Sequence, residues 1–344
     1  MVGEMAGVDD RYARQRVLPE IGDRGQERLM EASALIVGCG ALGTVEAELL
    51  ARAGVGRIRI ADRDVVEENN LQRQVLFDEQ DVRDGLPKAE AAARKLRAIN
   101  STITIEAMVK DVTPRNVEQI IDGMTVVLDG TDNFETRYLL NDACVKHATP
   151  WVYGGVLGTS GTTMAVVPHE GPCIRCLFPE PPPHGSMPTC ETAGVLSAAS
   201  AMIASLETAA AIRLITQQEP GEHRLVQIDP WSGSFLSVRV ERRASCPCCG
   251  QGKYEYLDAM ETSWITTLCG RNSIQIEPAH ASSLSLDDVA ARLEAVGTVT
   301  NNGMLIKVEI GEHRLLVFPD GRAIIQGTTD EAVARSLYSK YLGN

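Results

Sequence analysis

The sequence predicts an α/β protein built on a doubly wound, Rossmann-like mixed sheet, followed by a small C-terminal α+β domain. Three observations support this fold class. Strand-like and helix-like segments alternate through the first 150 residues. A glycine-rich turn, "GCGALG", separates the first of these strands from the helix after it. Two Cys-x-x-Cys pairs, which begin at Cys173 and Cys246, indicate a shared structural zinc ion.

The alternation of patterns predicts the order of the elements. Strand patterns occur at residues 33–40, where the apolar run is continuous, and at residues 57–62, 102–108 and 125–130. Helical patterns follow them at residues 41–54, 87–100, 114–122 and 133–147. After Trp151, strand patterns without paired helices occur at residues 161–168, 224–229 and 234–240. We therefore expect the sheet to gain antiparallel strands there.

The most apolar stretch, residues 193–215, is interrupted by Glu207 and Arg213, so it predicts a buried helix and not a membrane span. From about Lys253 the composition resets into short strands, two helical patterns and a tight turn at Asp320–Gly321. We expect a first domain over residues 1–252 and a second over 253–344.

Composition narrows the classes of partner. The formal net charge is −13, which disfavours nucleic acid and anionic membranes, so an anionic substrate must meet specific Arg and Lys side chains. The N-terminal residues are acidic and polar where a signal peptide has an apolar core. Nine cysteines in such a chain indicate reduced thiols, and we expect a cytoplasmic protein.

The glycine-rich turn predicts a nucleotide site. Gly38, Gly40 and Gly43 have G-x-G-x-x-G spacing, which lets a phosphate approach the backbone at a helix N-terminus. Asp62 ends the next strand, where a carboxylate accepts ribose hydroxyls. Taken alone, these residues favour NAD and a nicotinamide-dependent oxidoreductase.

Polar residues near the predicted strand ends argue against hydride transfer. Cationic, amide and carboxylate side chains gather there, at Asp64, Asn70, Arg73, Lys88 and Asp132, with Arg14 near the N-terminus. Sites that stabilise charge on a transferred phosphoryl group use Arg, Lys and a metal ion. A carboxylate such as Asp132 suits Mg²⁺, which takes oxygen ligands.

The cysteines divide by spacing. Cys173, Cys176, Cys246 and Cys249 present two pairs of thiolates for one tetrahedral Zn²⁺, and four protein ligands make the site structural. Cys190 has no partner at ligand spacing and precedes a helical pattern, which favours a reactive thiol. The remaining cysteines are expected in the core (Cys39, Cys144) or have no assigned role (Cys248, Cys269).

Several short motifs in the same order carry a resemblance: "RYARQRVLPEIGDRGQERL", "GCGALGT", "ADRDVVEENNLQRQ", "PKAEAA", "GTDNFETRYLLNDAC", "CIRCLFPEPPP" and "CPCCG". Together they resemble the ThiF/MoeB/HesA family of ubiquitin-activating-enzyme-like adenylyltransferases, from about Arg11 to Gly250. The tail resembles the C-terminal extension of some longer ThiF-type members, and no chemistry follows from that likeness.

The resemblance implies that residues 1–252 form an ATP-binding adenylation domain. It would use ATP and Mg²⁺ to adenylate the Gly-Gly C-terminus of a small ubiquitin-like sulfur carrier, for thiamine or molybdopterin biosynthesis. By matching motif, Asp62 would hold the ribose and Asp132 the Mg²⁺, while Gly40, Gly43, Asn70, Arg73 and Lys88 would contact the phosphates.

The family likeness also implies partners. Arg14 would reach into the other subunit of a homodimer, in the manner of an arginine finger. Cys190 would take part in sulfur transfer, with a separate sulfurtransferase or cysteine desulfurase as the donor. Two alternatives stay open: a nicotinamide-dependent oxidoreductase, and a carrier-binding homologue without catalysis. Arg73, Lys88 and Asp132 argue against both.

Overall fold

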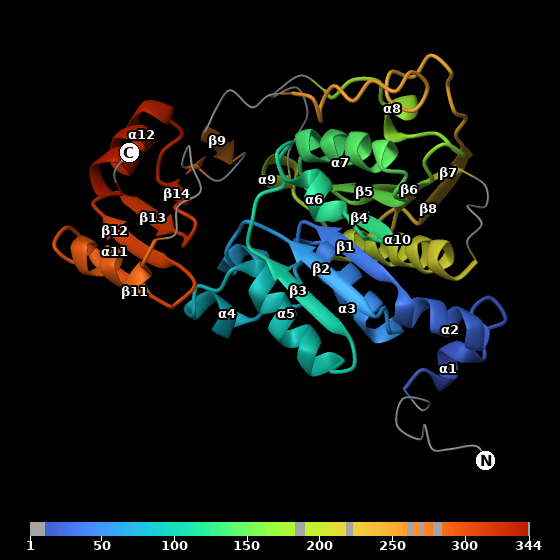
Figure 1. Cartoon of the computed structure of the whole chain (residues 1–344), viewed down its shortest axis with the longest axis horizontal. Coiled ribbons are helices and arrows are strands. Elements are labelled where there is room, and N and C mark those ends of the chain that lie inside the picture. Colours follow the sequence, from blue (N-terminus) through green and yellow to red (C-terminus); the bar gives the residue numbers. More distant parts are fainter. Residues whose placement is uncertain are drawn as a thin grey trace. The chain divides into compact units, whose positions relative to one another are not determined.

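Eight strands form a single mixed sheet in the order β3-β2-β1-β4-β5-β6-β7-β8 (Figure 1). Strands β3 to β5 pair in parallel, and β5 to β8 pair antiparallel, which confirms the change of pairing expected after Trp151. The strands are β1 Ser33–Val37, β2 Arg57–Ala61, β3 Thr104–Met108, β4 Val126–Asp129, β5 Trp151–Leu157, β6 Ser160–Val166, β7 Arg224–Asp229 and β8 Ser234–Arg239.

Helices cover both faces of this sheet. Helices α3 (Gly43–Ala53), α5 (Lys88–Ile99) and α10 (Ser197–Gln217) lie on one face, and α6 (Val117–Ile121) and α7 (Phe134–Lys146) lie on the other. The computed structural model thus has the predicted doubly wound architecture. The shorter helices are α1 Ala13–Arg16, α2 Gly22–Glu31, η1 Glu68–Asn70, α4 Glu79–Arg83, α8 Ile174–Leu177 and α9 Cys190–Ala193.

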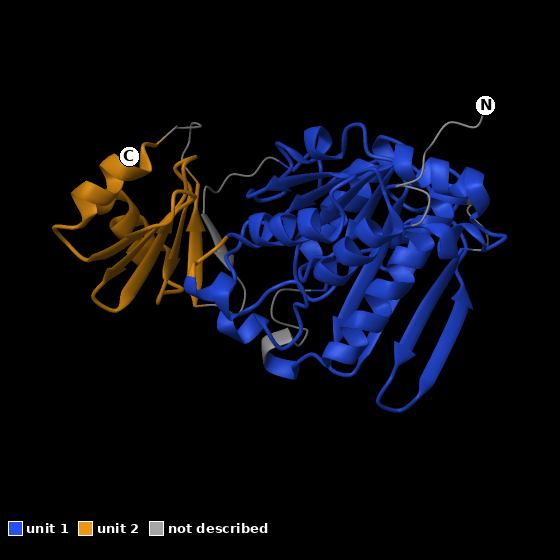
Figure 2. Cartoon of the chain, turned by 90° about the horizontal axis from the view of Figure 1, so that it is seen from below, with its two compact units in different colours: residues 1–83, 87–259 blue, residues 84–86, 260–344 orange. Residues whose placement is uncertain are grey.

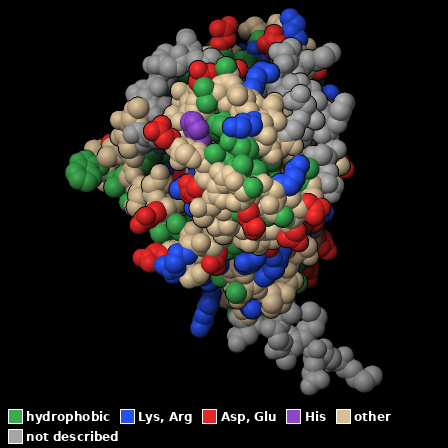
Figure 3. Space-filling view, turned by 90° about the vertical axis from the view of Figure 1, so that its left-hand side faces the viewer, with side chains coloured by type: hydrophobic (Ala, Val, Ile, Leu, Met, Phe, Trp, Pro, Cys, Tyr) green, Lys and Arg blue, Asp and Glu red, His purple; other side chains and the backbone are tan. Residues whose placement is uncertain are grey.

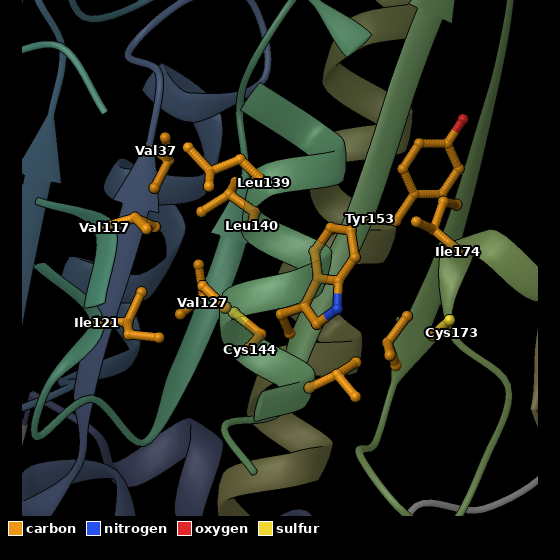
Figure 4. Packing of buried hydrophobic residues seen from close by; sticks show 14 of the residues in the cluster. Val37, Val117, Ile121, Val127, Leu139, Leu140, Cys144, Tyr153, Cys173 and Ile174 are labelled. Atoms are coloured by element: carbon orange, nitrogen blue, oxygen red, sulfur yellow. The ribbon is translucent and has the colours of Figure 1, made fainter. Parts of the chain in front are cut away.

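The core on the α6–α7 face joins the sheet to the cysteine pairs. Figure 4 shows side chains from β1, α6, β4, α7 and β5 converging there, with Cys173 at the edge of the group. Trp151 and Tyr138 are fully buried in this part of the molecule. The cysteine cluster therefore continues the hydrophobic core and is not a separate surface feature.

Helix α10 is the described helix that is long and apolar enough to cross a membrane by length and composition, over Ser197–Thr216. In the structure it packs on β5, β6 and α3. Its residues Ala199, Ile203 and Ala204 are completely buried there. This packing agrees with the expected core helix.

The structure describes residues 11–182, 190–217, 223–259, 265–268, 272–277 and 284–342. They fall into two units: residues 1–83 with 87–259, and residues 84–86 with 260–344 (Figure 2). The division follows Ala259, whereas the sequence suggested Gly252. Residues 253–259 stay with the first unit because Leu257 is in its core and Tyr256 donates a backbone hydrogen bond to Asp142 (2.9 Å).

In its described residues, the second unit has an antiparallel sheet in the order β11-β12-β13-β14-β10-β9 and the helices α11 and α12, in agreement with the expected α+β class. The face drawn in Figure 3 mixes acidic and basic side chains, so the acidic excess forms no single patch there. The elements are β9 Ile265–Leu268, β10 Ser273–Ile276, α11 Leu286–Leu293, β11 Thr298–Asn301, β12 Ile306–Ile310, β13 His313–Val317, β14 Ala323–Gln326 and α12 Glu331–Tyr341.

Candidate functional site

The candidate nucleotide site lies where the chain order of the sheet reverses. Strand β1 has β2 on one side and β4 on the other, so the loops that follow β1 and β4 emerge next to each other. Ligands of doubly wound sheets bind at this switch point, outside the carboxyl ends of the strands. The loops here carry the glycines at 38–43 and the segment 130–132.

The glycines of these loops have different roles. A Cβ on residue 38 would lie 2.6 Å from the Gly130 carbonyl oxygen, and one on residue 43 would lie 1.9 Å from the Gly38 carbonyl oxygen. Gly38 also has φ +88°, which favours glycine. A Cβ on residue 40 would meet nothing closer than 3.8 Å. Gly38 and Gly43 are therefore required by packing, whereas Gly40 leaves space beside the loop.

Asp62 is tied to the glycine loop. Its carboxylate accepts hydrogen bonds from the backbone N–H groups of Cys39 (2.6 Å) and Asp64 (2.7 Å). Burial raises the pKa of Asp62, and the nearby Lys88 partly offsets that effect. The carboxylate thus holds the turn between β1 and α3 in shape and keeps lone pairs for a further donor.

Next to this carboxylate, the buried Lys88 forms an ion pair with the partly exposed Asp64. Lys88 is 2% exposed, its Nζ lies 3.3 Å from Asp64 Oδ2, and its backbone N–H donates to the Asp64 carbonyl (2.9 Å). A buried amine with a single carboxylate partner has donor capacity left for a second anion. The pair therefore brings one fixed positive charge to the edge of the glycine loop.

Helix η1 and the residues just after it bring amide groups towards the same loop. Asn70 is 2% exposed and its side-chain oxygen accepts from the Glu67 N–H (3.1 Å), while Arg73 is half-buried and donates to the Asn69 carbonyl (2.9 Å). Sequence reasoning missed Gln74, which is 3% exposed and whose Oε1 has no hydrogen-bond partner in the described structure. Its position next to Arg73 was the available signal.

Asp132 stands at the end of a braced loop. Arg137 donates to Asp129 (Nε–Oδ2, 2.7 Å), to the Thr131 carbonyl (3.2 Å) and to the Gly154 carbonyl (2.8 Å). Burial disfavours the guanidinium charge, yet Asp129 raises the pKa of Arg137 overall, so this ion pair persists. Asp132 itself is exposed. Sequence reasoning missed Arg137, because a helical Arg carries no motif by itself.

Arg63 is a further cation of this region, and the sequence analysis did not single it out. It pairs with Asp111 and feels the charges of Asp64 and Asp132, which raise its pKa against the opposing effect of burial. Asp64, Lys88, Asp132 and the glycine loop are therefore parts of one charged region.

Arg14 is not part of this region. Its neighbour Tyr12 packs on Gly54, at the end of α3 opposite to the glycine loop. An eleven-residue helix such as α3 is about 16 Å long, which is further than an arginine side chain reaches. Arg14 is exposed. Because its helix is held at the C-terminal end of α3, it does not approach the candidate nucleotide site of its own chain.

The four predicted zinc ligands lie together. The Sγ atoms of Cys173 and Cys246 are 3.6 Å apart, those of Cys176 and Cys249 are 3.4 Å apart, and all four lie within 4.8 Å of one another. A tetrahedral zinc ion with Zn–S bonds of about 2.3 Å separates its sulfurs by about 3.8 Å. The cluster therefore fits a closed, structural zinc site.

The other cysteines differ. Cys39 and Cys144 are fully buried, and burial raises the pKa of each, which confirms them as core residues. Cys248 is buried and accepts a hydrogen bond from Asn141 (3.2 Å). Cys190 is the first residue of α9, and its side chain and Cys269 lie outside the described part of the structure.

A buried acid pair lies beneath the glycine loop. Glu46 of α3 and Glu207 of α10 are both fully buried, and no described residue outside the pair donates a hydrogen bond to their four carboxylate oxygens. Burial raises the pKa of Glu46 to about 8 and that of Glu207 well above its usual range. The pair therefore holds at least one proton near neutral pH. The sequence analysis did not predict this pair, because no motif contains both residues.

These features define an α/β protein of the nucleotide-binding type, with charged side chains at the switch point of its sheet and a buried cluster of four cysteines. The model of the ThiF family matches residues 12–248, and the chain belongs to that family. It is 42% identical over 336 residues to the sulfur carrier protein ThiS adenylyltransferase of Bacillus subtilis, covering 97% of this chain and 99% of the relative. It is 38% identical over 253 residues to the SAMP-activating enzyme E1 of Haloferax volcanii, covering 73% and 93%.

A solved structure supports the architecture. The crystal structure of E. coli MccB with ATP matches with a TM-score of 0.62 and 24% identity, over 71% of this chain and 75% of that one. At that identity the match shows the fold alone. The family resemblance drawn from the sequence motifs is thus confirmed.

Proposed function

We propose that this chain is an ATP-dependent adenylyltransferase that activates a small ubiquitin-like sulfur carrier at its C-terminal Gly-Gly carboxylate. The observation that carries the proposal is the buried Lys88, which is paired with Asp64 beside the glycine loop. A dehydrogenase binds its pyrophosphate mainly through backbone, whereas phosphoryl transfer needs fixed charges. The ThiS adenylyltransferase relative, which aligns over almost the whole chain, supports the same reading.

The reaction makes a poor acyl donor reactive. A carboxylate oxygen of the carrier attacks the α-phosphorus of ATP, the bond to the β-phosphate breaks, and an acyl-adenylate and pyrophosphate result. Both reactants are anionic, so cations must lie between them. Lys88, Arg73 and Asn70 would bind the phosphates, with Gly40 as the place of close approach.

Two carboxylates complete the nucleotide site. Asp62 would accept a ribose hydroxyl, because its hydrogen bonds to Cys39 and Asp64 leave acceptor capacity. Asp132 would hold Mg²⁺, since it is exposed at the end of the loop that Arg137 braces. When bound there, such an ion would neutralise negative charge on the phosphates.

Arg14 would act on the nucleotide of a second copy. Its position at the far end of α3 excludes its own site. A C2 homodimer would supply two such arginines, one to each site. The carrier for thiamine or molybdopterin biosynthesis is the expected acyl partner of both sites.

Cys190 would serve the step after adenylation. It begins α9, downstream of the proline-rich segment 179–183. We assign it a thiol role in sulfur transfer, with the sulfur supplied by a separate sulfurtransferase or cysteine desulfurase. The zinc ion at the four-cysteine cluster would have a structural role only, because no ligand position stays open for substrate.

Exchange of labelled pyrophosphate into ATP tests the proposal. The protein is assayed with Mg²⁺, with and without a small carrier ending in Gly-Gly, and with the same carrier lacking its last glycine as the control. Exchange that depends on the intact carrier is the expected result. Tight NAD binding without exchange for any carrier would favour the oxidoreductase alternative instead.

A further inference from the structure

Long side chains of the segment 11–16 contact other residues of the first unit, and Arg14 is the exception among the described contacts. Tyr12 is 3% exposed, Gln15 donates two hydrogen bonds, and Arg16 pairs with Asp23 (2.7 Å). Arg14 is exposed, and its side chain makes no hydrogen bond or ion pair with any residue that the structure describes. The short helix α1 therefore presents one unpaired cation from a fixed base.

Tyr12 occupies a slot made by two helix ends. Its hydroxyl accepts a hydrogen bond from Asn100 Nδ2 (2.8 Å), and the same amide donates to the Ala51 carbonyl (2.8 Å). Gly54 ends α3 at φ +82°, and a Cβ there would lie 2.5 Å from the Tyr12 ring. Asn100 is fully buried at the end of α5. The ring is thus confined by groups that have no room to move.

Gln15 fastens the helix a second time. Its Nε2 donates to Gln26 Oε1 (2.7 Å) and to the Ala53 carbonyl (2.9 Å). The backbone N–H groups of Gln15 and Arg16 donate to the Tyr12 carbonyl (3.0 and 2.9 Å). Arg14 lies between the two fastened residues, so its Cα is held from both sides.

We propose that Tyr12, Gln15 and Asn100 are positioning residues that hold Arg14 in place for the nucleotide site of a second copy. The inference rests on the proposed function, because it assumes that Arg14 acts between subunits. A four-residue helix is unstable alone, so without these contacts the arginine would sample many positions. Holding it fixed before the reaction removes that entropic cost from the transition state.

The test uses a double variant, Tyr12→Phe with Gln15→Ala. It removes the hydroxyl and the amide but keeps the ring in its slot and Arg14 intact, so the sheet and the site should still fold. Hydrogen exchange of the backbone N–H groups at positions 15 and 16 is measured first. Protection should fall in the double variant while amides of β1 stay protected. Unchanged protection at Gln15 and Arg16 would overturn the proposed role of these contacts.

Mixed dimers then show where the damage acts. Alone, the double variant should lose pyrophosphate exchange by about 10-fold to 100-fold. Mixed in equal amounts with a Lys88→Ala chain, which has a dead site but an intact Arg14, it should recover about a quarter of wild-type exchange, because half of the dimers then hold one complete site. Arg14→Ala mixed with Lys88→Ala should recover to the same extent.

The matched control is a chain with all three changes, Tyr12→Phe, Gln15→Ala and Lys88→Ala. Mixed with the double variant it supplies no well-held arginine, and exchange should stay low. Recovery by Lys88→Ala but not by this chain supports the inference, and equal recovery or none overturns it. A wild-type protein without exchange would instead contradict the proposed function, and hydrogen exchange would then decide the positioning role by itself.

Discussion

The four-cysteine cluster and the nucleotide site are organised in opposite ways. The cluster is buried, its four sulfurs lie within 4.8 Å of one another, and its cysteines come from two short segments far apart in sequence. The nucleotide site is spread over the carboxyl ends of several strands, and its groups range from the 2% exposed Lys88 to the exposed Asp132. One metal ion could bind all four sulfurs of the cluster. In the candidate nucleotide site, by contrast, charged side chains remain available to bind a substrate.

This contrast separates stability from chemistry. A closed set of thiolates binds its ion as part of folding, so its loss should act on the whole sheet. An exposed carboxylate at a loop end contributes little to folding, so its loss should act on the reaction. Variants in the two regions should therefore fail in different assays.

The largest effect is expected at the cluster. Cys176→Ser should lower bound zinc from about one ion per chain to none and weaken folding strongly, because such ions contribute on the order of 10 kcal/mol. Metal analysis and thermal unfolding measure the two quantities. Cys248→Ser is the matched control, since this buried thiol belongs to the same "CPCCG" segment but lies outside the set of four. Zinc loss in the control would show that the ligand set is wrong.

Asp132→Asn should give the reverse result. We expect pyrophosphate exchange to fall by about 100-fold or more, because an amide is a weaker Mg²⁺ ligand than a carboxylate. The unfolding temperature should stay as it is, because the side chain is exposed. Asp122→Asn, at the other end of β4, serves as the control and should change neither. A large stability loss in Asp132→Asn would erase the contrast between the regions.

Cys190→Ala should separate adenylation from the later sulfur-transfer step. Adenylation needs no thiol, so pyrophosphate exchange should equal that of the wild type. Sulfur transfer to the carrier in the presence of a sulfur donor should fall sharply, because the variant lacks the thiol that we assign to this step. Mass measurement of the carrier, as carboxylate or thiocarboxylate, reads out the second step. If exchange fell in parallel, the assignment of Cys190 to a later step would be wrong.

The sequence predicted the features that short motifs encode. Spacing was sufficient for the four cysteines, because each Cys-x-x-Cys turn presents two sulfurs together. Strand and helix patterns predicted β1 to β4 with the main helices between them and the antiparallel strands β6 to β8, but they predicted no strand at β5, Trp151–Leu157. Arg137 and the Tyr12–Asn100 contact were missed because their meaning depends on partners 8 and 88 residues away in the chain. Hydrophobic periodicity predicts which face of a helix is buried, but it does not predict which polar group from another part of the chain contacts that face.

The smallest effect concerns the buried pair of Glu46 and Glu207, whose carboxylate oxygens accept no hydrogen bond from any described residue outside the pair. Their folded pKa values lie above the unfolded value of about 4.3, so the folded state holds more protons. Stability from this pair is therefore fully present below pH of about 4 and is lost as the pH rises through about 8.

Glu207→Gln should flatten that decline, because the amide donates to Glu46 without any proton uptake. At pH 8.5 we expect the variant to be more stable than the wild type by about 1 kcal/mol, and denaturant unfolding between pH 6 and 9 measures the difference. Glu31→Gln, an exposed substitution, should leave the wild-type pH dependence in place. Parallel curves for Glu207→Gln and the wild type would mean that the two carboxyls hold no shared proton, and the acid pair would then resemble the solvated charges of the nucleotide site.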